Sequence, residues 1–258
     1  MPAFTLNDFW LLLAALGAGV MNAVAGGGTL LTFPALQTVV PLIVANATSS
    51  TALAPGSLAS VWGYRREIAA ARRWLVVLLA PTVLGSIVGA ATLIVLPEKY
   101  FALLVPWLLL LAAGLFLVQP YLAKWTGHAT GEAPSGRRLT TVAVCQFFVA
   151  VYGGYFGAGM GIMMLSALSL MGMSDIHEMN AVKSVLAALI NILAVAVFII
   201  DDKVDWYYAL FMAVTAILGG FLGAHYGRRL PRVLVRWVVI AIGFGLAAHF
   251  FYRYYGPS

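Results

Sequence analysis

Apolar runs of about 18 residues or more recur along the whole chain, and each is long enough to cross a hydrocarbon layer about 30 Å thick. Only 9% of the residues are charged, against roughly 25% in soluble domains, and the mean hydropathy is +0.96. A transmembrane β-barrel would show segments of about ten residues with alternating polarity, a pattern that the sequence lacks. The chain is therefore predicted to be an all-α polytopic membrane protein.

One polar block interrupts the apolar pattern near the middle of the 258 residues. It covers residues 123–137 and is rich in Gly, Pro, Ser and Thr, which is typical of a linker. We therefore expect a first transmembrane repeat at residues 1–122 and a second at residues 138–258. The first apolar segment follows no basic leader and has no cleavage site, so we expect it to be retained.

Several function classes find no support in the sequence. Cys145 is the only cysteine and the four histidines have no ligand spacing, so we expect no disulfide and no metal site. The chain has no phosphate-binding Gly-x-x-x-x-Gly-Lys-Ser/Thr loop and no recognisable Ser/His/Asp set, which argues against an ATP-driven pump and against an enzyme. The net charge of +6 comes mostly from loop arginines that orient a chain in a membrane, so we expect no cofactor and no nucleic-acid partner.

The second half of the chain repeats the first. Asn46-Ala47 recurs as Asn180-Ala181, 134 residues later, and the same offset pairs further Gly, Ser and Pro positions without a gap. Matches of Leu or Ala arise by chance in an apolar chain, but Asn, Gly and Pro in register indicate a duplication. Each half is predicted to hold one long apolar segment, at 6–40 and 139–172, and then three helices, near 44–64, 74–96 and 99–119 and near 179–200, 206–227 and 232–252.

Equivalent loops of the two halves carry opposite charge. The loop after 44–64 is basic and its counterpart is mainly acidic: Arg65, Arg66, Arg72 and Arg73 against Asp201, Asp202, Lys203 and Asp205. Because Lys and Arg mark the cytoplasmic side, this favours an inverted repeat in which each long segment enters and returns on one side. That arrangement places eleven basic residues inside and three outside, whereas a parallel arrangement of eight spans gives nine and five, with Lys183 left aside in both.

Glycine clusters interrupt both long segments. Gly26-Gly27-Gly28 opens the return of the first, and Gly157-Ala-Gly-Met-Gly161 opens the return of the second. A helix that begins at such a break presents unpaired amides and the positive end of its dipole, which together favour an anion. We therefore expect an anion site at Gly27, Gly28 and Thr29 and at Gly159 and Gly161. The alternative is that the glycines serve close helix packing alone, which is our interpretation of Gly85, Gly89, Gly219 and Gly223.

Polar side chains follow each break. Asn46, Ser49 and Ser50 open one predicted helix, and Asn180, Lys183 and Ser184 open its counterpart. They line the anion path in one interpretation; in the other, the asparagines are helix N-caps and the hydroxyls bond to their own helix. Lys183 is the one basic side chain inside a predicted span, and its alternatives are snorkelling or pairing with Asp175 or Glu178. Asn191 lies mid-helix, where it either bonds between helices or lines the path, and Asn22 and Gln146 are weaker candidates of the same kind.

With these residues in place, the chain resembles the TauE/SafE family of sulfite exporters. The stretches that carry the resemblance are Gly17 to Leu36 with Asn46 to Ser50, and Gly153 to Gly161 with Met179 to Lys183. The resemblance covers essentially the whole chain. It implies a multi-pass transporter of the cell inner membrane for a small sulfur-containing anion such as sulfite, sulfoacetate or a related organosulfonate, working without ATP.

The predicted function is therefore secondary transport of such an anion, bound at the glycine breaks. A cation substrate is disfavoured because no acidic side chain falls inside a predicted span. An anion channel and a non-transporting membrane scaffold stay as alternatives. The expected partners are the anion and the lipid bilayer, and a homo-oligomer is left open.

Overall fold

Eleven helices make up the described part of the chain, and no strand occurs in it. The computed structural model describes residues 6–24, 27–126, 136–170, 173, 175–226 and 232–256. The helices, in chain order, are α1 (Leu6–Val24), α2 (Thr29–Leu36), α3 (Leu42–Gly63), α4 (Arg65–Ala70), α5 (Arg72–Val95), α6 (Glu98–Thr126), α7 (Gly136–Tyr155), α8 (Met160–Leu170), α9 (Ile176–Ile200), α10 (Trp206–Tyr226) and α11 (Arg232–Tyr255).

The all-helical membrane fold predicted from composition is confirmed. Four stretches of helix are long and apolar enough to cross a membrane by length and composition, and three further apolar helices are shorter. α3 is absent from both groups because its first turns carry the polar run 46–51. The four long stretches are Arg72–Val95, Glu98–Val118, His177–Ile200 and Trp237–Tyr255, and the shorter ones are Leu139–Tyr155, Met160–Ser169 and Trp206–Leu222.

Two helix boundaries differ from the sequence-based expectation. The basic loop after α3 contains a short helix, α4, which begins directly after Tyr64 and ends one residue before α5. α6 continues to Thr126, seven residues beyond the expected end and into the expected linker. Most of the linker predicted at 123–137 lies outside the described residues, so the domain boundaries stay a prediction.

The helices of the second half follow those of the first at the offset found in the sequence. α3, α5 and α6 begin at Leu42, Arg72 and Glu98, and α9, α10 and α11 each begin 134 residues after their counterparts. Helix contacts also occur in equivalent pairs, since α1 packs against α10 as α7 packs against α5. α3 packs against its own counterpart α9, and α6 against α11. The two halves thus contact each other in a two-fold manner.

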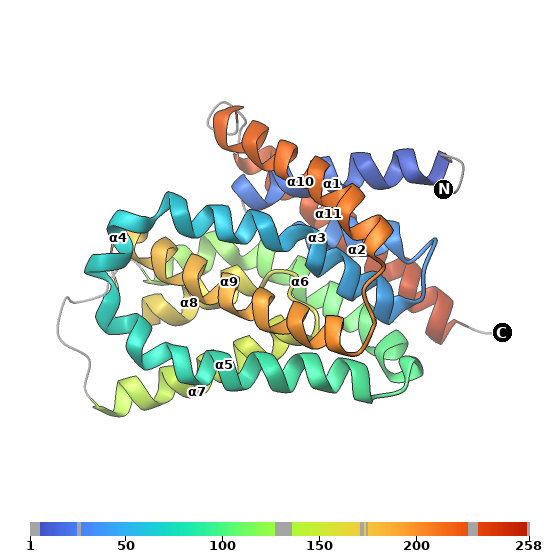
Figure 1. Ribbon diagram of the computed structural model, residues 1–258. Coiled ribbons are helices and arrows are strands. Elements are labelled where there is room, and N and C mark those ends of the chain that lie inside the picture. Colours follow the sequence, from blue (N-terminus) through green and yellow to red (C-terminus); the bar gives the residue numbers. More distant parts are fainter. Residues whose placement is uncertain are drawn as a thin grey trace.

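Equivalent helices run in opposite directions. In Figure 1, α3 runs from the right end of the molecule to the left end, whereas α9 runs from left to right. α1 begins at the right and α2 returns there, while α7 begins at the left and α8 returns there. The orientation of either half relative to a bilayer stays a prediction, because it depends on where the charged ends lie.

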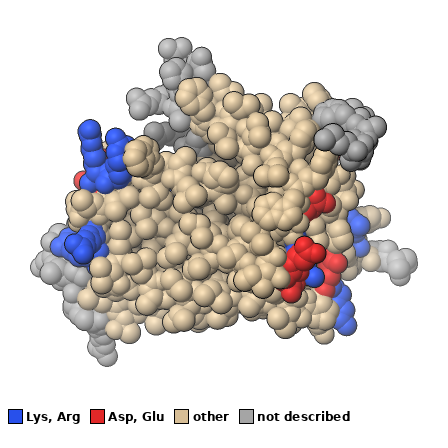
Figure 2. All heavy atoms as spheres, in the orientation of Figure 1, with Lys and Arg blue, Asp and Glu red and all other residues tan. Residues whose placement is uncertain are grey.

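Charged side chains gather at the two ends of the face drawn in Figure 2, and a broad uncharged band separates them. Exposed apolar side chains on the surface of the protein include Val76, Leu84, Leu210 and Phe221. In water such a surface would be an aggregation site, but it matches the acyl chains of a bilayer in composition. The basic segment from Arg65 to Arg73 and the acidic segment from Asp201 to Asp205 lie at opposite ends (Figure 1).

Glycines hold the two equivalent helix pairs at close range. A Cβ added at Gly85 or Gly89 of α5 would overlap the backbone of α7. A Cβ added at Gly219 of α10 would overlap the backbone of α1 at Leu16 in the same way. The packing role expected for these three glycines is therefore confirmed, and Gly223 lies where no side-chain surroundings are described. Small residues at such crossings let the helix backbones approach closely.

Candidate functional site: a cavity at two helix breaks

Both long segments are interrupted where the glycine clusters predict. α1 and α2 are separated by residues 25–28, and α7 and α8 by residues 156–159. Gly27 in the first break has a φ of +89°, and Gly157 and Gly159 in the second have φ of +80° and +77°. A side chain in this left-handed region costs about 1 to 2 kcal/mol, so the backbone itself requires glycine at these positions. The clusters are thus more than packing devices.

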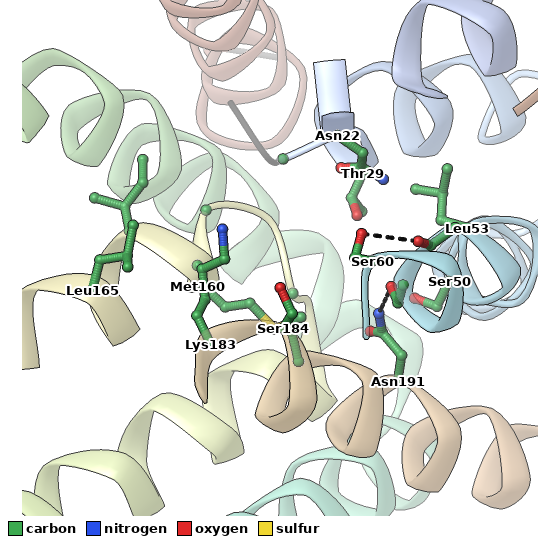
Figure 3. Close-up of a pocket in the computed structure, with 18 residues that line it drawn as sticks. Asn22, Thr29, Ser50, Leu53, Ser60, Met160, Leu165, Lys183, Ser184 and Asn191 are labelled. Atoms are coloured by element: carbon green, nitrogen blue, oxygen red, sulfur yellow. Dashed lines mark hydrogen bonds between the residues drawn. The ribbon is translucent and has the colours of Figure 1, made fainter. Parts of the chain in front are cut away.

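A cavity of about 130 Å³ lies where the two breaks meet α3 and α9 (Figure 3). Figure 3 shows the side chains around one space, with Asn22 and Thr29 on one side of it and Lys183 and Ser184 on another. The cavity brings together seven of the eleven predicted site residues, namely Gly27, Thr29, Ser50, Gly159, Gly161, Lys183 and Ser184. Its volume suits several waters or one small ligand.

Two of the remaining predicted residues hold the first break in place. The N–H of Gly28 donates to Asn22 Oδ1 at 2.7 Å, so this amide is already paired within the protein. The hydroxyl of Ser49 is fully buried and bonds to Thr32 Oγ1 at 2.5 Å, which joins α3 to α2. Neither residue lines the cavity. They position the residues that do.

The two asparagines are not N-caps, because both lie inside helices. α3 has Pro41 at its N-cap position, and α9 has Asp175, whose carboxylate accepts two backbone N–H groups. Asn46 instead donates through Nδ2 to the carbonyl oxygen of Tyr155 at 3.0 Å. This carbonyl is at the last residue of α7, where a helix end leaves acceptors unpaired. Asn46 thus satisfies a backbone group that the second break exposes.

Lys183 is the one charged side chain that lines the cavity within the described part of the chain. Its Nζ donates to Asn180 Oδ1 at 3.0 Å, one helical turn earlier on α9, and this contact places Asn180 next to the cavity. The described residues contain one ion pair, between Lys203 and Asp201, so the expected alternative of pairing with Asp175 or Glu178 is wrong. An ammonium at this depth without a carboxylate partner favours an anion beside it.

Backbone donors lie next to this ammonium. The N–H groups of Gly159 and Gly161 find no acceptor within the described part of the chain, and both residues line the cavity. They precede and open α8, so they carry the partial positive charge of its N-terminus. The methylene stem of Lys183 packs beside Gly161, where an added Cβ would lie 3.5 Å from Cδ. The ammonium and the helix end therefore act on the same side of the cavity.

Some lining residues were underrated or missed at the sequence level. Asn22 is a weaker candidate from the sequence, Asn191 is expected there to bond between helices or to line the path, and Ser57 and Ser60 are not among the candidates; all four line the cavity. Asn191 Nδ2 donates to Ser57 Oγ at 2.7 Å across the interface of α9 and α3. The repeat could have revealed Ser57, because this residue lies 134 positions before Asn191. The offset links three further pairs of lining residues: Gly27 with Gly161, Ser50 with Ser184, and Leu53 with Ala187.

The rest of the cavity wall is apolar. Leu53, Met160, Ile162, Leu165 and Ala187 contribute side chains to it. Among the described residues, no carboxylate lines the cavity. The site therefore combines a cationic side, a set of neutral hydroxyl and amide groups, and an apolar side. Pockets of this composition bind small ligands whose charged end is held by few polar groups.

A multi-helix membrane fold with a polar, ligand-sized internal cavity is characteristic of membrane transporters. The sequence comparison gives the family: residues 11–250 match the family described as "Sulfite exporter TauE/SafE". The chain belongs to this family. It is a family of membrane exporters and not of enzymes, in agreement with the sequence-based predictions.

Curated relatives cover nearly the whole chain. A "Probable membrane transporter protein" of Haemophilus influenzae (strain ATCC 51907 / DSM 11121 / KW20 / Rd) is 28% identical over 91% of this chain and 91% of its own length. The "Probable membrane transporter protein YfcA" of Escherichia coli (strain K12) is 28% identical over 96% of this chain and 91% of its own. The "Probable membrane transporter protein ORF9" of Sinorhizobium sp is 26% identical over 95% of this chain and 92% of its own length. No solved structure matches the chain.

Proposed function

We propose that this protein is a secondary transporter of the cell inner membrane that carries a small sulfur-containing anion, such as sulfite, sulfoacetate or a related organosulfonate. The anion binds in the cavity between the two helix breaks. One observation carries the proposal. The cavity brings the Lys183 ammonium together with the unpaired N–H groups of Gly159 and Gly161, and no carboxylate of the described residues lines it. The choice of a sulfur-containing anion rests on the family, which is described as sulfite exporters.

The geometry assigns a role to each part of the cavity. The Lys183 ammonium and the amides of Gly159 and Gly161 hold the anionic group, because they supply the positive charge and the free donors. The hydroxyls of Ser50 and Ser184 donate to the remaining oxygens. An organosulfonate would place its short carbon chain against Ile162 and the other apolar residues of the wall.

The orientation in the membrane follows from the charged ends. The end with Arg65, Arg66, Arg72 and Arg73 faces the cytoplasm in this proposal, since short cytoplasmic segments carry most Lys and Arg. The opposite chain directions of α3 and α9 support an inverted repeat, which many secondary transporters use. Each half then crosses the membrane three times, and α1 with α2, or α7 with α8, enters and returns on one side.

Ligand-dependent stabilisation of the purified protein tests the proposal. A ligand that binds only the folded state raises stability by about 2.7 kcal/mol at one hundred times its Kd. We expect an increase in Tm with sulfite, thiosulfate or sulfoacetate, measured in detergent, and a smaller one or none with taurine or a simple carboxylate. The absence of stabilisation by every one of these compounds would overturn the proposal in favour of a scaffold without transport.

A glycine variant tests the location of the site. Gly161→Leu adds a side chain into the cavity beside Lys183, where the backbone itself accepts a Cβ. It should abolish uptake into proteoliposomes while the protein still inserts. Gly27→Leu is a poor test because its φ is +89° and its Cβ would overlap the Phe116 ring. Normal flux in the Gly161 variant would exclude the break as the binding site.

A further inference from the structure

Four buried phenylalanines meet near the centre of the molecule. Phe33 comes from α2, Phe101 from α6, Phe250 from α11, and Phe156 from the second break. Each is at most 1% exposed. The ring of Phe33 lies 5.4 Å from that of Phe156, 6.0 Å from that of Phe101 and 6.3 Å from that of Phe250. We call these four residues the aromatic cluster; both halves of the chain contribute to it.

The aromatic cluster adjoins the cavity through its place in the chain. Phe156 directly precedes Gly157, which lines the cavity. Beyond the cluster lies a second recess of about 400 Å³, to which Ala102 and Tyr254 contribute. Phe101 directly precedes Ala102, and Phe250 stacks on Tyr254 with ring centroids 5.9 Å apart. Residues of the cluster thus adjoin lining residues of both hollows in the chain, and the Phe33 ring meets those of Phe101 and Phe156 edge to face and stacks on that of Phe250.

The second recess has the charge of an anion entrance. Lys99 and Arg253 line it together with Glu98. The carboxylate of Glu98 accepts the N–H of Leu42 at 2.6 Å, so it is engaged at the N-terminus of α3. Lys99 lies over the Tyr100 ring, and Arg253 donates to Gln37 Oε1 at 3.4 Å. Neither cation forms an ion pair with a carboxylate among the described residues, so both keep their charge available to an anion.

The internal repeat has other residues at three of the four positions that correspond to the cluster. Phe156, Phe33 and Phe101 correspond to Asn22, Ala167 and Val235, whereas Phe250 corresponds to the buried Phe116. Asn22 is exposed and lines the cavity, and the same holds for Gly56 and Ser60 of α3. The cavity is thus open to the surface between α1 and the last two turns of α3. These turns lead directly into α4, which carries Arg65 and Arg66.

We propose that the anion pathway runs from the opening at Asn22, through the cavity and the aromatic cluster, to the recess of Lys99 and Arg253, and that the cluster is its closed gate. This inference rests on the proposed function. The structure then represents the state in which the site is open toward the basic, cytoplasmic end. The opposite state requires Phe33 of α2 and Phe156 of the second break to separate. The two ends of the path are lined by different residues because the duplicated positions have diverged there.

Cysteine labelling tests the gate without a known substrate. The background is Cys145→Ser, and Ser184→Cys provides a thiol inside the cavity. The probe is 2-sulfonatoethyl methanethiosulfonate, which is anionic and does not cross membranes, applied to vesicles of defined orientation. We expect labelling from the face of α4 and at least about tenfold slower labelling from the face of Lys99. Equal labelling from both faces, or labelling from the Lys99 face alone, would overturn the proposal.

Removing rings should open the second face. Phe156→Ala or Phe33→Ala should raise the labelling rate from the Lys99 face by at least about tenfold. Phe198→Ala is the matched control, because Phe198 is equally buried but has no ring contact with the cluster. If the alanine variants are poorly folded, Phe156→Leu and Phe33→Leu replace them. If labelling from the Lys99 face stays slow in all cluster variants, or if Phe198→Ala speeds it as much, the cluster is ordinary hydrophobic core.

The converse change should close the open face. Asn22→Phe copies the residue of the second half into the equivalent position of the first. We expect it to slow labelling of the Ser184→Cys thiol from the α4 face by about tenfold, and an unchanged rate would contradict the gate. Labelling does not depend on substrate affinity. If the labelling results contradict the gate while anions still raise the Tm, this inference alone is overturned. If no anion raises the Tm, the proposed function is overturned.

Discussion

Asn191 donates a hydrogen bond to Ser57 at 2.7 Å, and the two residues occupy the same position in the two halves of the chain, 134 residues apart. Two equivalent residues of a two-fold arrangement meet only where its axis passes. The bond therefore places the axis at the contact of α3 with α9. Both residues also line the cavity, so the cavity lies on the axis, where repeat-built transporters place their substrate.

This hydrogen bond should contribute measurably to the contact of the two halves. Ser57→Ala and Asn191→Ala each remove one partner, and the double variant removes both. Polar pairs between membrane helices show couplings of about 0.6 kcal/mol on average and up to about 1.7 kcal/mol. We expect a coupling in that range from a double-mutant cycle on unfolding in detergent. Additive effects of the two single variants would contradict it.

The helices were predictable because their cause is local. Long apolar runs fixed the helices, and the glycine clusters at Gly27 and Gly159 marked the breaks, since only glycine has ready access to the left-handed backbone found there. The recurrence of Asn46 as Asn180 revealed the repeat. Each of these signals lies within one segment or in the comparison of the chain with itself.

The partners of individual polar groups were not predictable, because they depend on how distant helices pack. The pairing of Asn46 with the Tyr155 carbonyl joins residues 109 positions apart. Asn46 therefore looked like an N-cap, the common local use of asparagine. Ser57 was missed because its neighbours in sequence are unremarkable and only α9 gives it a role. The aromatic cluster likewise draws on four elements that no local pattern connects.

Lys183 should control anion affinity. Lys183→Met keeps the length and packing of the side chain but removes the charge, so we expect at least about tenfold weaker binding of sulfite or sulfoacetate, or about 1.4 kcal/mol. Titration with Tm as the signal measures this. Lys183→Arg keeps a cation and should retain part of the affinity. Lys203→Met, at an exposed ion pair, is the control and should bind like the wild type.

The left-handed glycines should matter for stability more than Gly161 does. Gly159→Ala forces a side chain into a φ of +77° and should lower the free energy of unfolding by about 1 to 2 kcal/mol. Gly161→Ala lies in α8, where its Cβ makes an ordinary contact, so stability should be unchanged or slightly higher. Thermal unfolding of the two variants side by side checks the order. Equal losses would contradict the assigned backbone.

The glycine at the contact of α10 with α1 should be intolerant of any side chain. Gly219→Val places methyl groups against the backbone of Leu16 and should cost about 1 to 3 kcal/mol through overpacking. Gly114→Val on α6 is the matched control, because a Cβ at Gly114 meets nothing within 4 Å. Its effect should stay near the helix-propensity difference, well below 1 kcal/mol. The measurement is Tm in one detergent.

The inverted orientation of the halves makes a prediction about two equivalent surface positions. Ala69 lies exposed on α4, and Lys203, 134 residues later, lies in the turn between α9 and α10 at the other end of the molecule (Figure 1). In the Cys145→Ser background, Ala69→Cys should be labelled by an impermeant thiol reagent from the cytoplasmic face only. Lys203→Cys should be labelled from the opposite face only. Because the two positions are equivalent in the repeat, labelling of both from one face would restore the parallel arrangement of eight spans, and it would also remove the basis for assigning the open side of the cavity to the cytoplasm.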